Sequence, residues 1–133
     1  MPMEISHIWL GRFSSEGDAK AYFAEHYNDG DENDEDGQIP FSQFAADQGE
    51  WFYDHDWLEL GFEENRDLRA LVARHSYSSD YLEEVLSRAN SLGLAGQANT
   101  FVVADKAEFN HPRSVETKHY QLWYLGEFFC TVP

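Results

Sequence analysis

The stretch of sequence that decides the fold is residues 78–104, SSDYLEEVLSRANSLGLAGQANTFVVA. Its first part repeats apolar residues at helical spacing, which predicts a helix over residues 80–92 with a single apolar stripe. Its last part, residues 100–104, is an unbroken run of apolar and β-branched residues, which predicts a buried strand. A helix with one apolar face beside a buried strand indicates a fold in which helices cover a sheet.

Both ends of the predicted helix carry residues that can cap it. Ser78 or Ser79 can accept backbone N–H groups at its start, and Gly93 can close its end. The apolar stripe includes Leu86, which we expect to be buried against the rest of the fold.

Two further strands are predicted on either side of this stretch. Residues 5–13 alternate in the manner of a strand, and we expect Trp9 to lie buried within it. Residues 118–129 form a long terminal strand, separated from strand 100–104 by the polar connection 105–117. Adjacent strands joined by a short connection usually pair antiparallel, so we expect these last two strands to pair.

The remaining elements are short helices. Residues 16–27 and 67–74 have helical spacing of apolar residues, and Ser42 can open another short helix, whereas residues 51–62 fit a strand or a helical turn. The whole chain, residues 1–133, is therefore predicted to be a single α+β domain. Its small antiparallel sheet has three to four strands and is packed by three to four helices.

The charge of the chain is concentrated in its first half. The protein has 25 acidic against 9 basic residues, a net charge of −16, and residues 1–66 hold 17 of the acids. Nucleic acids and anionic lipids are unsuited partners, because Lys and Arg drive such binding. The acidic half is either a solvated face that maintains solubility or a surface that receives a basic protein.

Acids alternate with aromatics in residues 51–59, WFYDHDWLE, which is the composition of an interface rather than of a solvating tail. Carboxylates in the preceding loop, residues 28–37, would steer a basic partner toward it. The alternative for Asp54 or Asp56 is to cap a helical turn. The candidate partner-binding residues are Tyr53, Asp54, Asp56 and Glu59 in the run, with Asp31, Asp34 and Asp36 in the loop.

The acidic loop also resembles the calcium loop of EF-hand proteins. In residues 32–43, ENDEDGQIPFSQ, acids occupy the first, third and fifth positions and Gly37 the sixth. The first position is Glu32 rather than Asp, Pro40 interrupts the loop, and Gln43 cannot supply the bidentate carboxylate of the twelfth position. We therefore predict no cofactor and no metal site, while weak calcium binding by this loop stays open.

No arrangement of residues predicts catalysis. None of the six histidines forms a His-x-x-x-His pair, and in an extended Asp54-His55-Asp56 segment the imidazole points away from both carboxylates. Ser76 follows His75 directly, but adjacency along the chain is not the geometry of a nucleophile and its base. We expect no enzymatic activity.

The single cysteine, Cys130, excludes an internal disulfide. The N-terminus lacks the features of a signal peptide, and no apolar run approaches the roughly 18 residues that span a membrane. We expect a cytoplasmic protein that contacts no membrane. Its 10 Phe, 7 Tyr and 4 Trp allow a monomer or a homodimer.

The chain resembles the Immunity protein 22 family of bacterial polymorphic toxin systems. Four segments carry the resemblance. HIWLGRF (7–13) resembles the family's W-I-G-x-F start, and FSQF with YDHDWLE (41–44 and 53–59) resembles its S-x-F … Y-D-x-D-F-L-E block. HSYS (75–78) resembles its h-S-Y-S region, and residues 120–129, which contain LGEF (125–128), resemble its terminal F-x-G-x-F strand. Two departures are Trp57, where the family has Phe, and the acidic insertion 29–37, which is longer than usual.

The resemblance implies a non-enzymatic protein that binds and neutralises a cognate toxin, often a nuclease. A nuclease needs a basic surface to hold its substrate, so an acidic inhibitor can occupy that surface. The alternatives are a small metal-dependent regulator or enzyme, and an acidic adaptor that binds basic partners.

Overall fold

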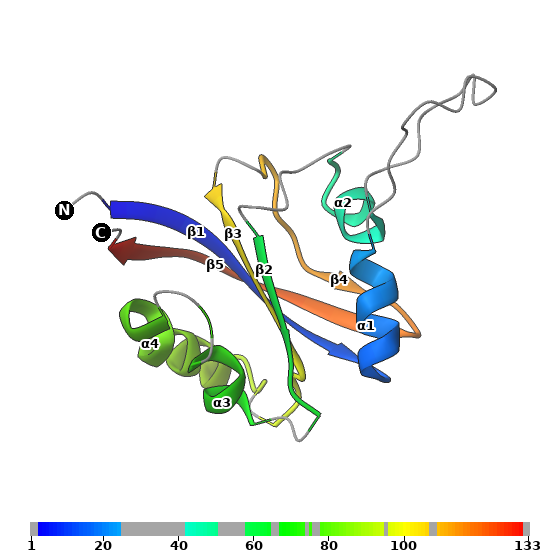
Figure 1. Cartoon of the computed structure of the whole chain (residues 1–133), viewed down its shortest axis with the longest axis horizontal. Coiled ribbons are helices and arrows are strands. Elements are labelled where there is room, and N and C mark those ends of the chain that lie inside the picture. Colours follow the sequence, from blue (N-terminus) through cyan, green and yellow to red (C-terminus); the bar gives the residue numbers. More distant parts are fainter. Residues whose placement is uncertain are drawn as a thin grey trace.

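A computed structural model describes most of the chain. The described residues are 3–24, 42–50, 58–64, 67–73, 75, 78–94, 96–106 and 109–131. Their order along the chain is strand, two short helices, strand, two helices and three strands, which makes an α+β fold (Figure 1).

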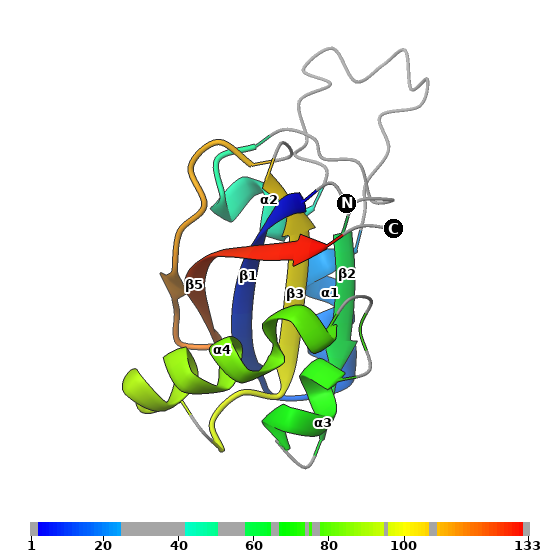
Figure 2. The same ribbon diagram turned by 90° about the vertical axis from the view of Figure 1, so that its left-hand side faces the viewer.

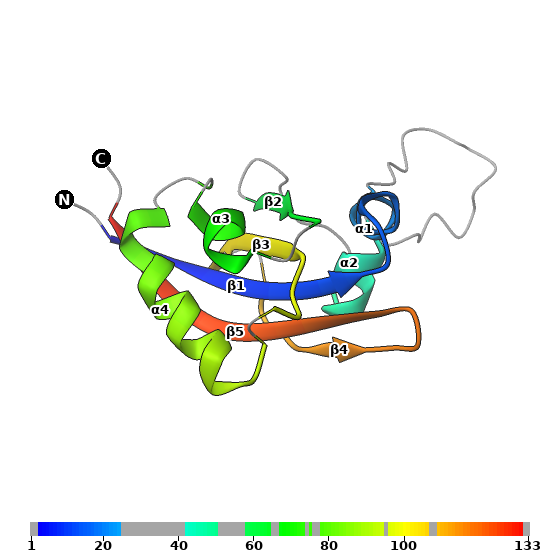
Figure 3. The ribbon, with the colours of Figure 1, turned by 90° about the horizontal axis from the view of Figure 1, so that it is seen from below.

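One antiparallel sheet of five strands forms the centre of the described structure. The strand order is β2-β3-β1-β5-β4, with β2 and β4 at the two edges (Figure 3). The strands are β1 Met3–Phe13, β2 Leu58–Phe62, β3 Thr100–Asp105, β4 Val115–Glu116 and β5 Tyr120–Thr131. The helices are α1 Glu16–Phe23, α2 Gln43–Asp47, α3 Leu68–Ala73 and α4 Ser78–Ser91.

Helices cover both faces of the sheet. Figure 2 shows α3 and α4 in front of the strands and α1 and α2 behind them. Side chains of β1 alternate between the two layers, so that Leu10 packs with α3 and α4 and Trp9 packs with α1 and α2. Both faces of β1 are therefore buried, and neither Trp9 nor Leu10 has solvent exposure.

The predicted strand arrangement needs two corrections. The sheet has five strands rather than three to four, because the polar connection after β3 contains the short strand β4 and β2 adds an edge. The predicted pairing of β3 with β5 is wrong, since β1 lies between them and pairs with both. The N-terminal strand is long and apolar on both sides, which suits the middle of a sheet better than an edge.

Most of the predicted helix signals are confirmed. The Ser42 hydroxyl accepts the Ala45 backbone N–H at the start of α2, and Gly93, with φ of 73°, follows α4. Helix α4 begins at Ser78, so both Ser78 and Ser79 lie inside its first turn and neither occupies the predicted cap position before it. Trp9 is buried as expected, whereas Leu86 is only half-buried at the margin of the core.

Buried polar side chains tie irregular segments to the sheet. The amide of Gln48, which has no solvent exposure, donates to the Arg113 carbonyl (2.9 Å) and accepts from the Arg113 N–H (2.6 Å). The amide of Asn99 pairs in the same way with the N–H (3.0 Å) and carbonyl (2.7 Å) of Phe13. Each amide pairs with a backbone N–H and a backbone carbonyl, as a neighbouring strand would. Gln48 thereby fixes the connection after β3, and Asn99 fixes the end of β1.

Candidate binding surface

Of the predicted partner-binding residues, the structure describes Glu59 alone. The loop residues Asp31, Asp34 and Asp36 and the run residues Tyr53, Asp54 and Asp56 lie outside the described residues. The candidate calcium loop, residues 32–43, also falls outside them except for its last two positions. Both segments remain candidates on the strength of the sequence, and the elements that flank them can be placed.

Glu59 lies on β2 at the edge of the sheet, beside His75. Its Oε1 is 3.7 Å from His75 Nδ1, and its side chain keeps 44% of its exposure, whereas that of His75 keeps 6%. The His75 ring packs on Phe101, with centroids 4.6 Å apart. A Cβ at Gly61 would collide with this ring, so a glycine on β2 makes room for His75. The Glu59 carboxylate thus lies beside a buried imidazole while it still faces solvent.

The helices on either side of residues 25–41 are fixed to each other through Asp47. One carboxylate oxygen of Asp47, on α2, accepts the hydroxyls of Tyr22 on α1 (2.8 Å) and Tyr120 on β5 (2.6 Å). Burial, and then the hydrogen bond to the Asp47 carboxylate, raises the pKa of Tyr22 and of Tyr120 well above the ordinary tyrosine range. Both phenols therefore stay protonated and act as donors, which holds α1, α2 and β5 together at Asp47.

The edge strand β2 and helix α1 border a small apolar hollow. Its volume is about 150 Å³. Leu60, on β2, lines it and is 44% exposed. The lining residues are Glu16, Ala19, Lys20 and Phe23 from α1, Leu60, Gly61 and Phe62 from β2, and Thr100 from β3.

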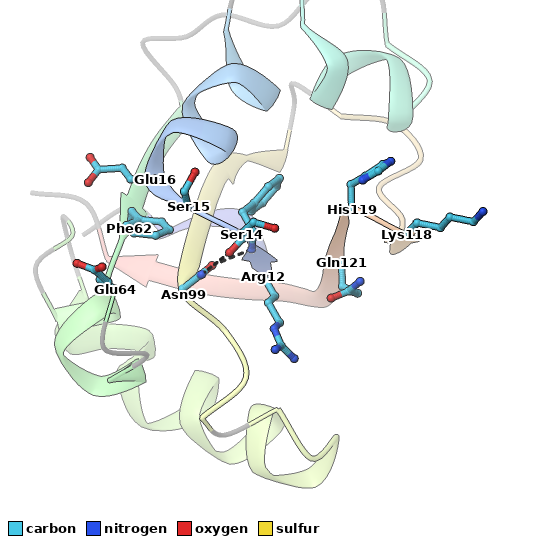
Figure 4. A pocket seen from close by; sticks show the side chains of 11 residues that line it. Arg12, Ser14, Ser15, Glu16, Phe62, Glu64, Asn99, Lys118, His119 and Gln121 are labelled. Atoms are coloured by element: carbon cyan, nitrogen blue, oxygen red, sulfur yellow. Dashed lines mark hydrogen bonds between the residues drawn. The ribbon is translucent and has the colours of Figure 1, made fainter.

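A wider polar cleft of about 760 Å³ adjoins the hollow and shares Glu16 and Phe62 with it. Figure 4 shows its side chains in two groups, with Glu16 and Glu64 on one side and the three residues Arg12, Lys118 and His119 on the other. The register of β1 with β5, which places Arg12 opposite Gln121, brings the basic group together. The cleft thus presents acids and bases on opposite walls.

Sequence reasoning missed the hollow and the cleft because it followed the acidic residues. Arg12 and Lys118 are more than a hundred positions apart, and nothing in the local sequence signals that they share a surface. The available signal was Leu60, an apolar residue directly after the acid and aromatic run. Its exposure depends on β2 being an edge strand, which the sequence left undecided.

The most buried histidine of the described residues has a structural environment. His7 is 3% exposed, and its Nδ1 lies 2.7 Å from the Tyr124 hydroxyl. Burial lowers the pKa of His7, and this outweighs the opposing effects of the Phe109 backbone and the Glu127 carboxylate. Within the described ranges, no three His, Cys, Asp or Glu side chains gather in a way that could hold a metal ion.

Among the described helices, none combines the length and the apolar character that a bilayer crossing requires.

A family model described as Immunity protein 22 matches residues 6–129 of the chain. No curated protein matches the chain. No solved structure matches it either.

Proposed function

Since the chain belongs to the Immunity protein 22 family, we propose that it binds a cognate toxin and neutralises it without catalysing a reaction of its own. Family membership over nearly the whole chain is the observation that carries this proposal. In this role the protein acts in the cytoplasm as a single domain, either as a monomer or as a homodimer, and needs no metal or cofactor.

The proposed toxin is basic, as a nuclease is. The net charge of −16 supports this proposal, because electrostatic complementarity speeds association and disfavours wrong partners. A nuclease holds its substrate through Lys and Arg that neutralise phosphates. An acidic protein that covers those groups competes directly with the nucleic acid.

Two groups of acids have different proposed roles. Asp54, Asp56 and Glu59, together with Tyr53, contact the toxin directly and hold it. The loop acids, by contrast, attract the toxin from a distance. The position of Glu59 supports this division, since its solvent-facing carboxylate lies next to the buried His75 on a strand of the sheet.

The proposal is tested first with the toxin encoded by the neighbouring reading frame. Co-expression should restore growth of cells that produce the toxin, and the purified proteins should form a stable complex. An unrelated acidic protein of similar size and charge is the control, and it should give no protection. Binding to many unrelated basic proteins, lost in moderate salt, would instead identify an acidic adaptor. Saturable calcium binding or catalytic turnover by the pure protein would favour the metal-dependent alternative.

The division between holding and attracting acids is tested by binding kinetics. Asp54→Asn and Asp56→Asn should each weaken binding by about 2–5 kcal/mol, mainly through faster dissociation, if their carboxylates meet a Lys or Arg in a desolvated interface. If either residue only caps a helical turn, stability should fall by about 1 kcal/mol and affinity should not change. Thermal melts of each variant separate the two outcomes.

Neutralising the loop acids should have a different kinetic signature. The triple variant Asp31→Asn, Asp34→Asn, Asp36→Asn should slow association and leave dissociation nearly unchanged. The effect should shrink as salt rises, because charges separated by more than about 8–10 Å are screened at physiological ionic strength. Surface plasmon resonance at several salt concentrations measures both rates.

A further inference from the structure

The hollow between α1 and β2 differs from the other exposed apolar groups of the described structure. Leu92 and Phe129 are more exposed than Leu60, at 60% and 57%, but neither lines a described hollow. Leu60 instead lines a hollow that is open to solvent, together with Phe23 of α1. An exposed apolar side chain beside a concave space is where an interface gains most from excluding water.

The size of the hollow suits one side chain. A cavity of about 150 Å³ is large enough to take a benzene-sized group, and the hollow has that volume. Part of its wall is held in place, because Ala19 and Phe23 belong to the buried layer between α1 and the sheet. An apolar hollow of this size can hold a leucine or phenylalanine side chain with little rearrangement of that part of its wall.

The rim of the hollow indicates what accompanies that side chain. Glu16 lines both the hollow and the polar cleft, and the exposed Glu64 lines the cleft on the same side. The one base at the hollow, Lys20, is already paired with Glu16 at 3.2 Å. Such an exposed pair contributes little and can exchange partners. The bases Arg12, Lys118 and His119 lie on the opposite wall of the cleft, so the wall beside the hollow is the acidic one and favours a positive charge next to the apolar group.

We propose that the hollow between α1 and β2 receives an apolar anchor side chain of the toxin, while Glu16 and Glu64 bind a Lys or Arg beside that anchor. This inference rests on the proposed function, since it names the contact that the toxin makes. It adds a second contact area, which lies on the described part of the chain and is independent of the acidic loop. The anchor supplies affinity, and the carboxylates orient it.

The test compares two exposed leucines by surface plasmon resonance against the toxin. Leu60→Arg places a charge in the hollow and should weaken binding about 30-fold or more, mainly through faster dissociation. Leu92→Arg makes the same change at a more exposed leucine outside the hollow and should alter affinity less than about twofold. Leu60→Ala, which only removes the wall, should weaken binding to a smaller extent, and thermal melts check that each variant folds.

A second pair of variants tests the charged rim. Glu64→Gln should weaken binding about 3- to 10-fold at low salt, and the loss should diminish as salt is raised. Its control is Glu116→Gln, on the opposite edge strand β4, which should change neither affinity nor its salt dependence.

Hydrogen exchange provides a measurement that needs no variant. In the wild-type complex, backbone amides of α1 and β2 should become protected, whereas those around Leu92 should not. This inference alone would be overturned by the following result. The wild-type protein neutralises the toxin, but Leu60→Arg and Leu60→Ala bind the toxin normally and α1 and β2 gain no protection. A wild-type protein that neither binds nor neutralises the toxin would overturn the proposed function, and this inference with it.

Discussion

The two faces of the sheet are built in different ways. Against α3 and α4 the core is mainly aliphatic, and it rests on the apolar stripe of α4 and on side chains such as Leu71 and Val85. Against α1 and α2 the core is mainly aromatic, with Trp9, Phe13 and Phe44 at its centre. The aliphatic face packs the long helix α4 together with the short α3, while the aromatic face packs two short helices that could not form alone.

The aromatic face also contains the polar contacts that place surface segments. Asp47 binds Tyr22 and Tyr120, and Gln48 binds the backbone at Arg113. The comparison teaches that the α1 and α2 face carries the apolar hollow and the helices that flank residues 25–41. The α3 and α4 face mainly stabilises the sheet, and it also holds Glu59 beside His75.

The largest expected effect is at Trp9, the centre of the aromatic face. Trp9 packs edge-on against Phe44 and Phe109, with centroids 5.1 and 5.3 Å away, and its indole N–H donates to the Arg113 carbonyl. Trp9→Ala should lower the free energy of unfolding by about 3–5 kcal/mol. Urea unfolding followed by circular dichroism measures this loss. A loss below about 1 kcal/mol would mean that the aromatic face contributes little to folding.

An intermediate effect is expected at Asp47, where a substitution should loosen the aromatic face and leave the aliphatic face unchanged. Asp47→Ala leaves the Tyr22 and Tyr120 hydroxyls without their acceptor and should cost about 1–3 kcal/mol. Amide exchange should then rise in α1 and α2 and remain low in α4. Gln43→Ala, which removes only an exposed donor to Asp47, is the matched control and should change stability by less than about 0.5 kcal/mol. Equal loosening of α1 and α4 would show that the faces do not act separately.

The smallest effect on stability is expected from His7, and it takes the form of a dependence of stability on pH. Because burial lowers its pKa below 6.5, the unfolded chain binds a proton more readily than the folded protein does. Stability from His7 is therefore complete above pH 6.5 and is lost as pH falls through that value toward the lower folded pKa. Melting temperatures from pH 8 to pH 5 measure the loss, and His7→Asn should reduce it. The exposed His119→Asn is the control, and an equal reduction in both variants would rule out His7 as the source.

Local sequence determined the elements whose signals are short in range. The helix at α4, the serine that caps α2, the strand at β1 and the buried strand at β3 each followed from spacing or capping within a dozen residues. The net charge and its concentration in residues 1–66 also follow from the sequence alone. A basic partner is expected from this charge distribution, which does not depend on how the chain folds.

Tertiary structure decided the strand order and the shape of the surface. Local patterns do not state which strand lies in the middle, and β1 separates β3 from β5 because both of its faces can be buried. The bulge in β5 is likewise not indicated by any local pattern. Ile8 pairs with Gly126 and Trp9 with Tyr124, so Leu125 is an extra residue in β5 at this step. The exposure of Leu60 and the cleft that Arg12 and Lys118 both line depend on pairings between distant segments. Spacing along a chain encodes contacts within an element, whereas the packing of the whole chain selects the contacts between elements.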